Sequence, residues 1–154
     1  MTRLEVPTAE DMHQLGRRLG EQLRAGDVVV LDGPLGAGKT TLTRGLGEGL
    51  GVRGPVTSPT FVLARTHPSV VDGPPLVHVD AYRLGSPVEL DDLDIDFPHA
   101  VVVVEWGAGM VESLAESRLE LLIERPASGS DEEDEPRIVT ATGVGPRWAD
   151  GLPL

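Results

Sequence analysis

The sequence predicts one α/β domain over residues 1–154. Its mixed β-sheet has a parallel core with antiparallel additions, and helices form layers on the faces of the sheet. Two uninterrupted valine-rich runs, at 28–31 and 101–104, are typical of parallel strands that are buried on both faces. A glycine-rich loop at 33–38 separates the first run from a helical pattern. A chain of 154 residues is long enough to form a single domain with its own core.

The first fifty residues alternate strand and helix signals. Residues 3–6 are predicted as a short strand, and Thr8–Asp11 resembles a capping box with Asp in place of Glu. Apolar residues at helical spacing then predict a helix over 9–25. A buried strand at 27–32 and a second helix from Lys39 to about Gly51 complete this part.

The remainder of the chain contains mostly strand signals. Turn residues between 67 and 75 join two strand patterns, which predicts an antiparallel hairpin. Residues 127–136 are rich in Ser, Gly and acids and are predicted to form a mobile loop. The other elements that we expect are strands at 60–66, 76–80, 101–104, 118–124 and 137–142, and helices that begin at Ser86 and span 111–116.

The composition excludes several classes of protein. There is no cysteine, so the chain has no disulfide, no Cys-ligated zinc and no thiol nucleophile. Thirteen Lys and Arg against 25 Asp and Glu give a formal charge of −12, which argues against dominant contact with a phosphate backbone. No apolar run approaches the roughly 20 residues that span a bilayer, and no signal peptide is recognisable. We therefore expect a soluble cytoplasmic protein. Only one of the cations, Lys39, is a lysine.

That lysine lies in a phosphate-binding motif. Gly33-Pro-Leu-Gly-Ala-Gly-Lys-Thr40 matches G-x-x-x-x-G-K-[ST], and it has the strand before it and the helix after it that this motif requires. Its backbone N–H groups can face phosphate oxygens, the ammonium can reach the β- and γ-phosphates, and the Thr40 hydroxyl can bind Mg²⁺. Thr41 is either a further phosphate contact or a helix-start residue. The backbone positions that we expect at the phosphates are Gly33, Gly36, Ala37 and Gly38. The predicted fold is therefore a P-loop NTPase-like three-layer sandwich.

Acidic residues follow two of the predicted strands. Glu105 comes directly after four valines and is either a Mg²⁺-facing acid or a solvated strand end. Asp80 is either a residue that positions water beside a γ-phosphate or a turn residue. His78 would share its strand face with Asp80, and we interpret it as a hydrogen-bonded structural histidine. Arg83 either pairs with nearby acids or contacts nucleotide.

Two further segments are candidates for the site. The loop at 57–61 carries Thr, Ser and Pro after the second helix and either folds over the γ-phosphate as a switch or forms an ordinary Ser-Pro turn. Trp106 is either a core residue, a neighbour of the nucleotide or an anchor for a partner protein. The acids at 89–96 do not have the spacing of a Ca²⁺ loop and form either a solvated face or a surface for a basic partner.

Four blocks taken together resemble the TsaE family, also called YjeE, whose members are small P-loop ATPases of bacterial tRNA threonylcarbamoyladenosine synthesis. The blocks are GPLGAGKTTLTRGL at 33–46, SPTF at 58–61, HVDAYRL at 78–84 and VVEW at 103–106. The segment after residue 110 carries little of the resemblance. The DEEDE loop at 131–135 looks like an insertion.

The resemblance implies a role for each matching residue. It implies that the protein hydrolyses ATP to ADP and phosphate slowly on its own and faster when bound to a TsaD–TsaB heterodimer. That heterodimer modifies adenosine 37 of tRNA, so the protein would contact tRNA only through its partners. Asp80 would be needed for hydrolysis, and Trp106 would lie near the site. Thr40 and Glu105 would hold Mg²⁺, and the segment around Thr8 would approach the adenine. The phosphate contacts implied are Gly36, Gly38, Lys39, Thr40 and Thr41. The switch residues implied are Ser58, Pro59 and Thr60. Together with Asp80, the catalytic candidates are Lys39 and Thr60.

Two other classes of function remain open from the sequence. A small-molecule kinase on the same fold would need an acceptor site and an arginine-bearing lid, and no insertion of that length is present. A nucleotide-dependent switch or scaffold without useful catalysis would bind ATP without needing Asp80.

Overall fold

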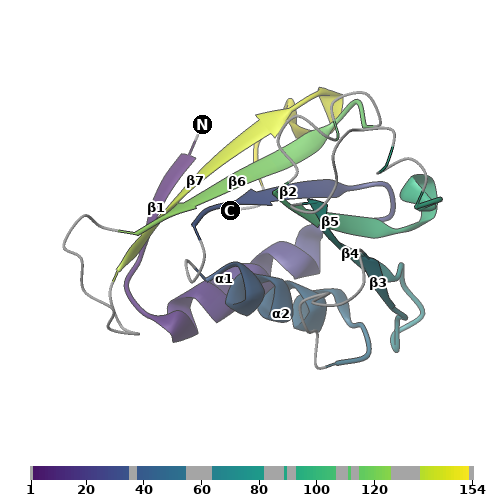
Figure 1. Ribbon diagram of the computed structural model, residues 1–154, viewed down its shortest axis with the longest axis horizontal. Coiled ribbons are helices and arrows are strands. Elements are labelled where there is room, and N and C mark those ends of the chain that lie inside the picture. Colours follow the sequence, from purple (N-terminus) through teal and green to yellow (C-terminus); the bar gives the residue numbers. More distant parts are fainter. Residues whose placement is uncertain are drawn as a thin grey trace.

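The computed structural model describes residues 2–34, 38–54, 64–81, 89, 93–106, 111, 115–125 and 136–152. They form one seven-stranded sheet with two α-helices (Figure 1). In chain order the elements are β1 (Thr2–Val6), α1 (Ala9–Gln22), β2 (Val28–Asp32), α2 (Lys39–Leu50), β3 (Ala64–His67), β4 (Leu76–Asp80), η2 (Phe97–His99), β5 (Val101–Glu105), β6 (Arg118–Glu124), β7 (Arg137–Val144) and η3 (Pro146–Trp148).

The predicted mixed sheet is confirmed. Its strands lie in the order β1-β7-β6-β2-β5-β4-β3. The core is parallel, because β2 pairs in parallel with β5 and β6, and β5 pairs in parallel with β4. The antiparallel additions are the predicted β3–β4 hairpin at one edge and, at the other, β7, which pairs antiparallel with both β6 and β1.

Both described α-helices cover the same face of the sheet (Figure 1). Leucines from α1 and α2 pack there against alternate residues of the central strands, including Val29, Leu31 and Val103. The opposite face is packed by residues 93–97 and by Val111 and Ala115. The helices expected from Ser86 and over 111–116 fall mostly outside the described residues, although the Ala115 amide donates to the Val111 carbonyl at 3.0 Å.

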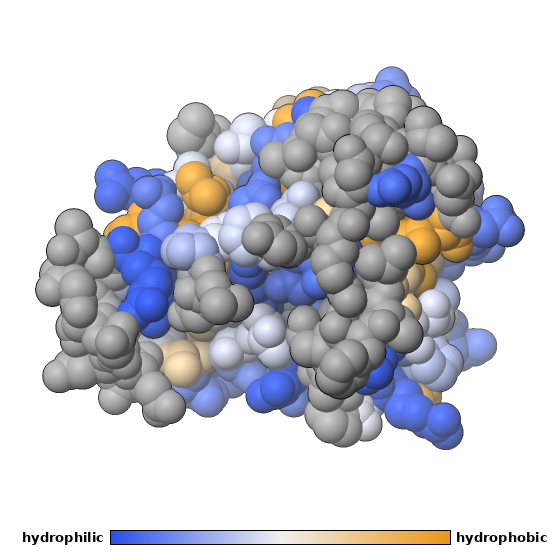
Figure 2. All heavy atoms as spheres, viewed as in Figure 1, coloured by the Kyte–Doolittle hydropathy of each residue, from blue (hydrophilic) through white to orange (hydrophobic). Residues whose placement is uncertain are grey.

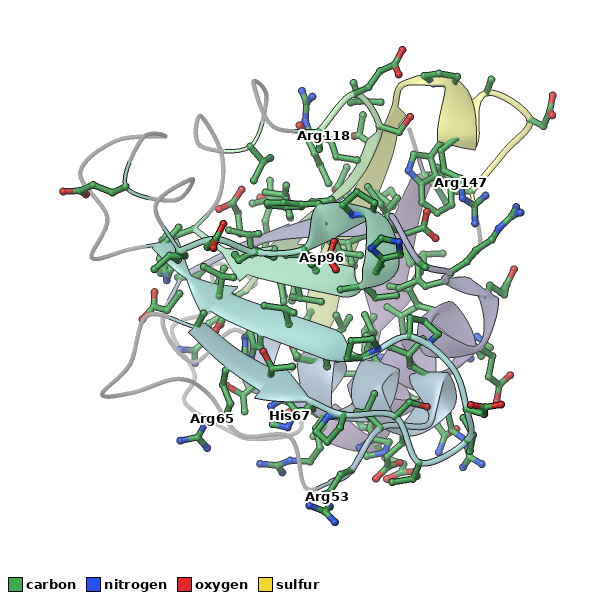
Figure 3. All side chains as sticks on the ribbon, turned by 90° about the vertical axis from the view of Figure 1, so that its right-hand side faces the viewer. Arg53, Arg65, His67, Asp96, Arg118 and Arg147 are labelled. Atoms are coloured by element: carbon green, nitrogen blue, oxygen red, sulfur yellow. The ribbon has the colours of Figure 1, made fainter. Side chains whose placement is uncertain are left out.

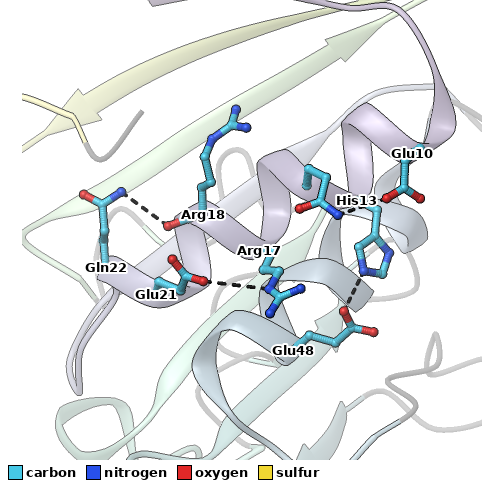
Figure 4. A network of polar contacts seen from close by, with 8 residues as sticks. Glu10, His13, Arg17, Arg18, Glu21, Gln22 and Glu48 are labelled. Atoms are coloured by element: carbon cyan, nitrogen blue, oxygen red, sulfur yellow. Dashed lines mark hydrogen bonds and ion pairs between the residues drawn. The ribbon is translucent and has the colours of Figure 1, made fainter.

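The two helices approach each other through glycines on both sides. A Cβ added at Gly16 or Gly20 of α1 would collide with the Leu42 or Leu46 carbonyl oxygen of α2. Gly45 and Gly49 of α2 face the backbone of α1 in the same way. On the outer side of this contact, His13 of α1 and Glu48 of α2 join through Nε2 and Oε2 at 2.6 Å (Figure 4).

Several element boundaries differ from the prediction. α1 ends at Gln22 rather than residue 25, because the Asp27 carboxylate accepts the Arg24 amide at 2.8 Å and Gly26 takes a left-handed φ of 96°, so that a turn replaces the last helical residues. β1 and β7 pair from Thr2 onward, and β7 extends to Val144. Most of the acidic loop at 127–136 and the first residues of the strand expected at 60–66 lie outside the described residues.

On the face shown in Figure 2, the described residues are mostly hydrophilic. Among the described residues, no helix combines the length and apolar character needed to cross a membrane.

Candidate nucleotide-binding site

The candidate site lies at one edge of the sheet because three parallel strands end there together. Glu105, the last residue of β5, is in register with Leu31 of β2 and with Asp80 of β4. Asp32 ends β2, and Gly33 follows it. In open α/β sheets this carboxyl edge is where ligands bind. The sheet therefore brings together the phosphate loop and the two acids that the sequence placed at strand ends.

The described part of the phosphate loop leads directly into α2. Gly38 is the N-cap residue of α2 and takes a left-handed φ of 110°, which glycine adopts without steric cost. Its Cα faces Met12 of α1, whose Cε would lie 3.3 Å from an added Cβ. Thr8 lies one helical turn before Met12 and caps α1, since its hydroxyl oxygen accepts the Asp11 amide at 3.1 Å. The start of α1 therefore points toward the same end of the sheet as the loop.

Lys39 is held inside this edge. The residue is only 6% exposed, and its Nζ donates to the Gly33 carbonyl at 2.8 Å. The ammonium also lies 3.5 Å from the centroid of the Trp106 ring, a cation–π contact. Burial lowers the pKa of Lys39, and the nearby carboxylates of Glu105, Asp32 and Asp80 oppose that shift. The ammonium therefore lies among acids, next to the loop that precedes it.

Trp106 is fixed by an unusual backbone conformation. Its φ is 59°, a left-handed value that non-glycine residues rarely adopt, and its amide donates to the Leu31 carbonyl at 3.0 Å. This bond continues the β2–β5 pairing by one residue and turns the indole toward Lys39. Strained backbone of this kind concentrates at functional sites.

Glu105 has a buried partner. The residue is 6% exposed, and its Oε2 lies 2.8 Å from Nε2 of His78, which is completely buried. Since an ionised carboxylate can only accept, the imidazole Nε2 is the donor. The sequence interpretation of His78 as a hydrogen-bonded histidine agrees with this geometry, but its partner could not be read from the sequence.

The side chains present suit a Mg²⁺ ion bound together with phosphates. Thr40 provides a hydroxyl oxygen at the start of α2, and Glu105 provides a carboxylate. Mg²⁺ usually takes one or two protein oxygens and completes its shell with water and phosphate. In keeping with that, no group of three or more His, Cys, Asp or Glu side chains arranged to hold a metal occurs among the described residues.

Part of the predicted site falls outside the residues that the structure describes. The loop residues Gly36 and Ala37 and the switch residues Ser58, Pro59 and Thr60 lie outside the described residues, as does Arg83. Thr40 and Thr41 begin α2 and are half-buried. One acid that the sequence analysis did not select, Asp32, also acts on Lys39. Its position as the last residue of a buried strand before the glycine loop was the available signal.

Comparisons with known proteins find relatives over most of the chain. The family described as "Threonylcarbamoyl adenosine biosynthesis protein TsaE" matches residues 6–133. A Streptomyces coelicolor protein named tRNA threonylcarbamoyladenosine biosynthesis protein TsaE is 66% identical over 141 residues, which cover 90% of this chain and 94% of that protein. The Bacillus subtilis protein of the same name is 41% identical over 128 residues, which cover 81% of this chain and 75% of that protein.

A solved structure supports the same relationship. The crystal structure of Bacillus subtilis YdiB superimposes with a TM-score of 0.69 at 34% sequence identity, and the match covers 95% of this chain and 87% of that chain. The fold, the motif blocks and the similarity over most of the chain agree with one another. The chain belongs to the TsaE family.

Proposed function

We propose that this protein binds ATP with Mg²⁺ at the β2, β4 and β5 edge and hydrolyses it to support threonylcarbamoyladenosine modification of tRNA in the cytoplasm. The names of its relatives support the pathway. The observation that carries the ATPase proposal is the position of Lys39, buried in the G-x-x-x-x-G-K-T loop and facing the strand-end acids. By the family resemblance, its partner is a TsaD–TsaB heterodimer, and tRNA is met only through that partner.

In this proposal each residue has a defined task in hydrolysis. Lys39 exchanges the Gly33 carbonyl for β- and γ-phosphate oxygens, and the backbone N–H groups of the loop bind the remaining oxygens. Thr40 and Glu105 hold Mg²⁺, which when bound neutralises charge on the phosphates. Asp80 orients the attacking water and accepts its proton. The water oxygen bonds to the γ-phosphorus as the bond from that phosphorus to the bridging oxygen breaks, giving ADP and phosphate.

The contacts of Lys39 also favour slow turnover by the isolated protein. ATP must compete with the Gly33 carbonyl and the Trp106 ring for the ammonium. Charge stabilisation of the transferred phosphoryl group dominates this type of chemistry, so a lysine engaged elsewhere contributes little. We propose that the partner closes the Ser58–Thr60 switch and aligns Asp80 with the water.

The experiment that tests this function is an ATPase assay with and without purified TsaB and TsaD. We expect the mixture to hydrolyse ATP faster than the sum of its parts. Asp80→Asn should reduce turnover in the mixture by at least about 100-fold while ATP binding persists, because the water is then no longer oriented or deprotonated. Asp150→Asn, at an exposed position, is the matched control.

Three outcomes would argue against the proposal. Absence of both binding and stimulation would contradict the partnership. An Asp80→Asn protein with full turnover would favour a switch without useful catalysis. Consumption of ATP that depends on a small phosphate acceptor would favour a kinase.

A further inference from the structure

We infer that His78 is a positioning residue that fixes the carboxylate of Glu105 for the Mg²⁺–nucleotide complex. The inference deepens the proposed function and rests on it. His78 is completely buried on β4, on the helix-covered face that it shares with Leu76 and Asp80. Its Nε2 lies 2.8 Å from Oε2 of Glu105 on the neighbouring strand.

The bond controls the direction in which the carboxylate faces. A glutamate side chain has three rotatable bonds, and a donor on one carboxylate oxygen restricts them. The His78 bond occupies Oε2, which leaves Oε1 as the oxygen that can face an ion at the strand edge. Imidazoles and carboxylates that hold metal ligands in this way typically change metal affinity by 10- to 100-fold when they are removed.

A purely structural role explains His78 less well. Its Nδ1 is buried and has no hydrogen-bond partner among the residues that the structure describes. An unsatisfied buried polar atom costs stability, and an aliphatic side chain would fill the same space without that cost. What the imidazole provides and an aliphatic side chain lacks is the donor to Glu105.

A second buried histidine offers a matched control. His67 lies on β3, the neighbouring edge strand, with Arg53 and Arg65 close by (Figure 3). It is 7% exposed, and its Nε2 also lacks a partner within the described part of the chain. No bond joins it to Glu105 there, so replacing it removes a buried imidazole without removing the proposed positioning contact.

The test measures the Mg²⁺ dependence of nucleotide binding in three variants. ADP affinity is measured in EDTA and over a series of Mg²⁺ concentrations for wild type, His78→Leu, His78→Gln and His67→Leu. His78→Leu should need about 10-fold more Mg²⁺ to reach the half-maximal effect. His78→Gln, whose amide can still donate, and His67→Leu should remain close to wild type. ADP affinity in EDTA should be the same in all four proteins.

A second measurement uses only the wild-type protein, so it does not depend on whether a variant folds. Nitrogen-15 spectra of the wild-type imidazoles should show His78 with its proton on Nε2, and this signal should move when Mg²⁺ is added to the ADP complex. A His78→Leu protein with the wild-type Mg²⁺ requirement, or a His78 signal that ignores Mg²⁺, would overturn the inference while leaving the proposed function intact. Wild-type ADP binding that is itself independent of Mg²⁺ would instead contradict the metal site, and this inference with it.

Discussion

Replacing Lys39 by alanine is expected to lower ATP turnover in the TsaB–TsaD mixture by at least about 100-fold, the usual cost of losing one group that stabilises transition-state charge. Lys39 is the only lysine in the chain, and its ammonium group lies among the carboxylates of Glu105, Asp32 and Asp80. Without it these acids would repel the phosphates that the loop is expected to bind. ATP binding to the variant should therefore weaken together with turnover, as measured by steady-state kinetics and equilibrium binding.

Two variants define what the Lys39 result means. Arg44→Ala removes a cation from the exposed side of the same helix and should leave turnover unchanged. Lys39→Arg should remain impaired, because a planar guanidinium cannot replace the compact ammonium that the proposed function places on the β- and γ-phosphates. Wild-type turnover in Lys39→Ala would remove the basis of the proposed function.

Gly16→Ala is expected to be strongly destabilising, as is alanine at the other glycines of the α1–α2 contact. The new Cβ would overlap the Leu42 carbonyl oxygen, which is backbone in the middle of α2 and cannot rotate away. The helices must then separate, and overpacking of this kind costs about 2–3 kcal/mol, more than the roughly 1 kcal/mol that alanine gains over glycine in a helix. We expect the melting temperature to fall by several degrees, on the order of 5 °C, in thermal unfolding followed by circular dichroism.

Gly73→Ala is the control for that measurement. At Gly73 an added Cβ would make only ordinary contacts, with Ser69 Oγ at 3.6 Å. Its melting temperature should match wild type. A Gly16→Ala protein as stable as Gly73→Ala would show that the two helices are not packed backbone to backbone.

Local patterns were sufficient to predict most of the elements. The valine runs of β2 and β5 are apolar on both faces, and only a central parallel strand needs that pattern. The phosphate-binding motif also supported the strand and helix assignments on either side of it, because this motif requires a buried strand before its glycines and a helix after them. Strand order was harder, because the alternating pattern of β6 does not reveal that it pairs in parallel with β2 on one side and antiparallel with β7 on the other.

The sequence predicts those site residues whose side-chain chemistry and place at a strand end both point to phosphate binding. It does not predict contacts that form only once distant strands pair. Asp80 and Glu105 were selected because acids at strand ends can serve a phosphate site, and the register places them side by side. The bond from His78 to Glu105 and the indole over Lys39 join residues far apart in the sequence. The first depends on the pairing of β4 with β5, and the second on the left-handed backbone of Trp106. No local pattern encodes such contacts.

The single lysine makes a direct test of the central claim possible. Protein labelled only at lysine with ¹³C and ¹⁵N gives one set of side-chain NMR signals, from Lys39. In the free protein, the methylene protons next to the ammonium should be shifted upfield by the Trp106 ring, whose centroid lies 3.5 Å from Nζ. Addition of ATP with Mg²⁺ should move these signals as the ammonium transfers to the β- and γ-phosphates, whereas AMP should not. Signals that stay in place at saturating ATP would contradict the assignment of this edge of the sheet as the nucleotide site.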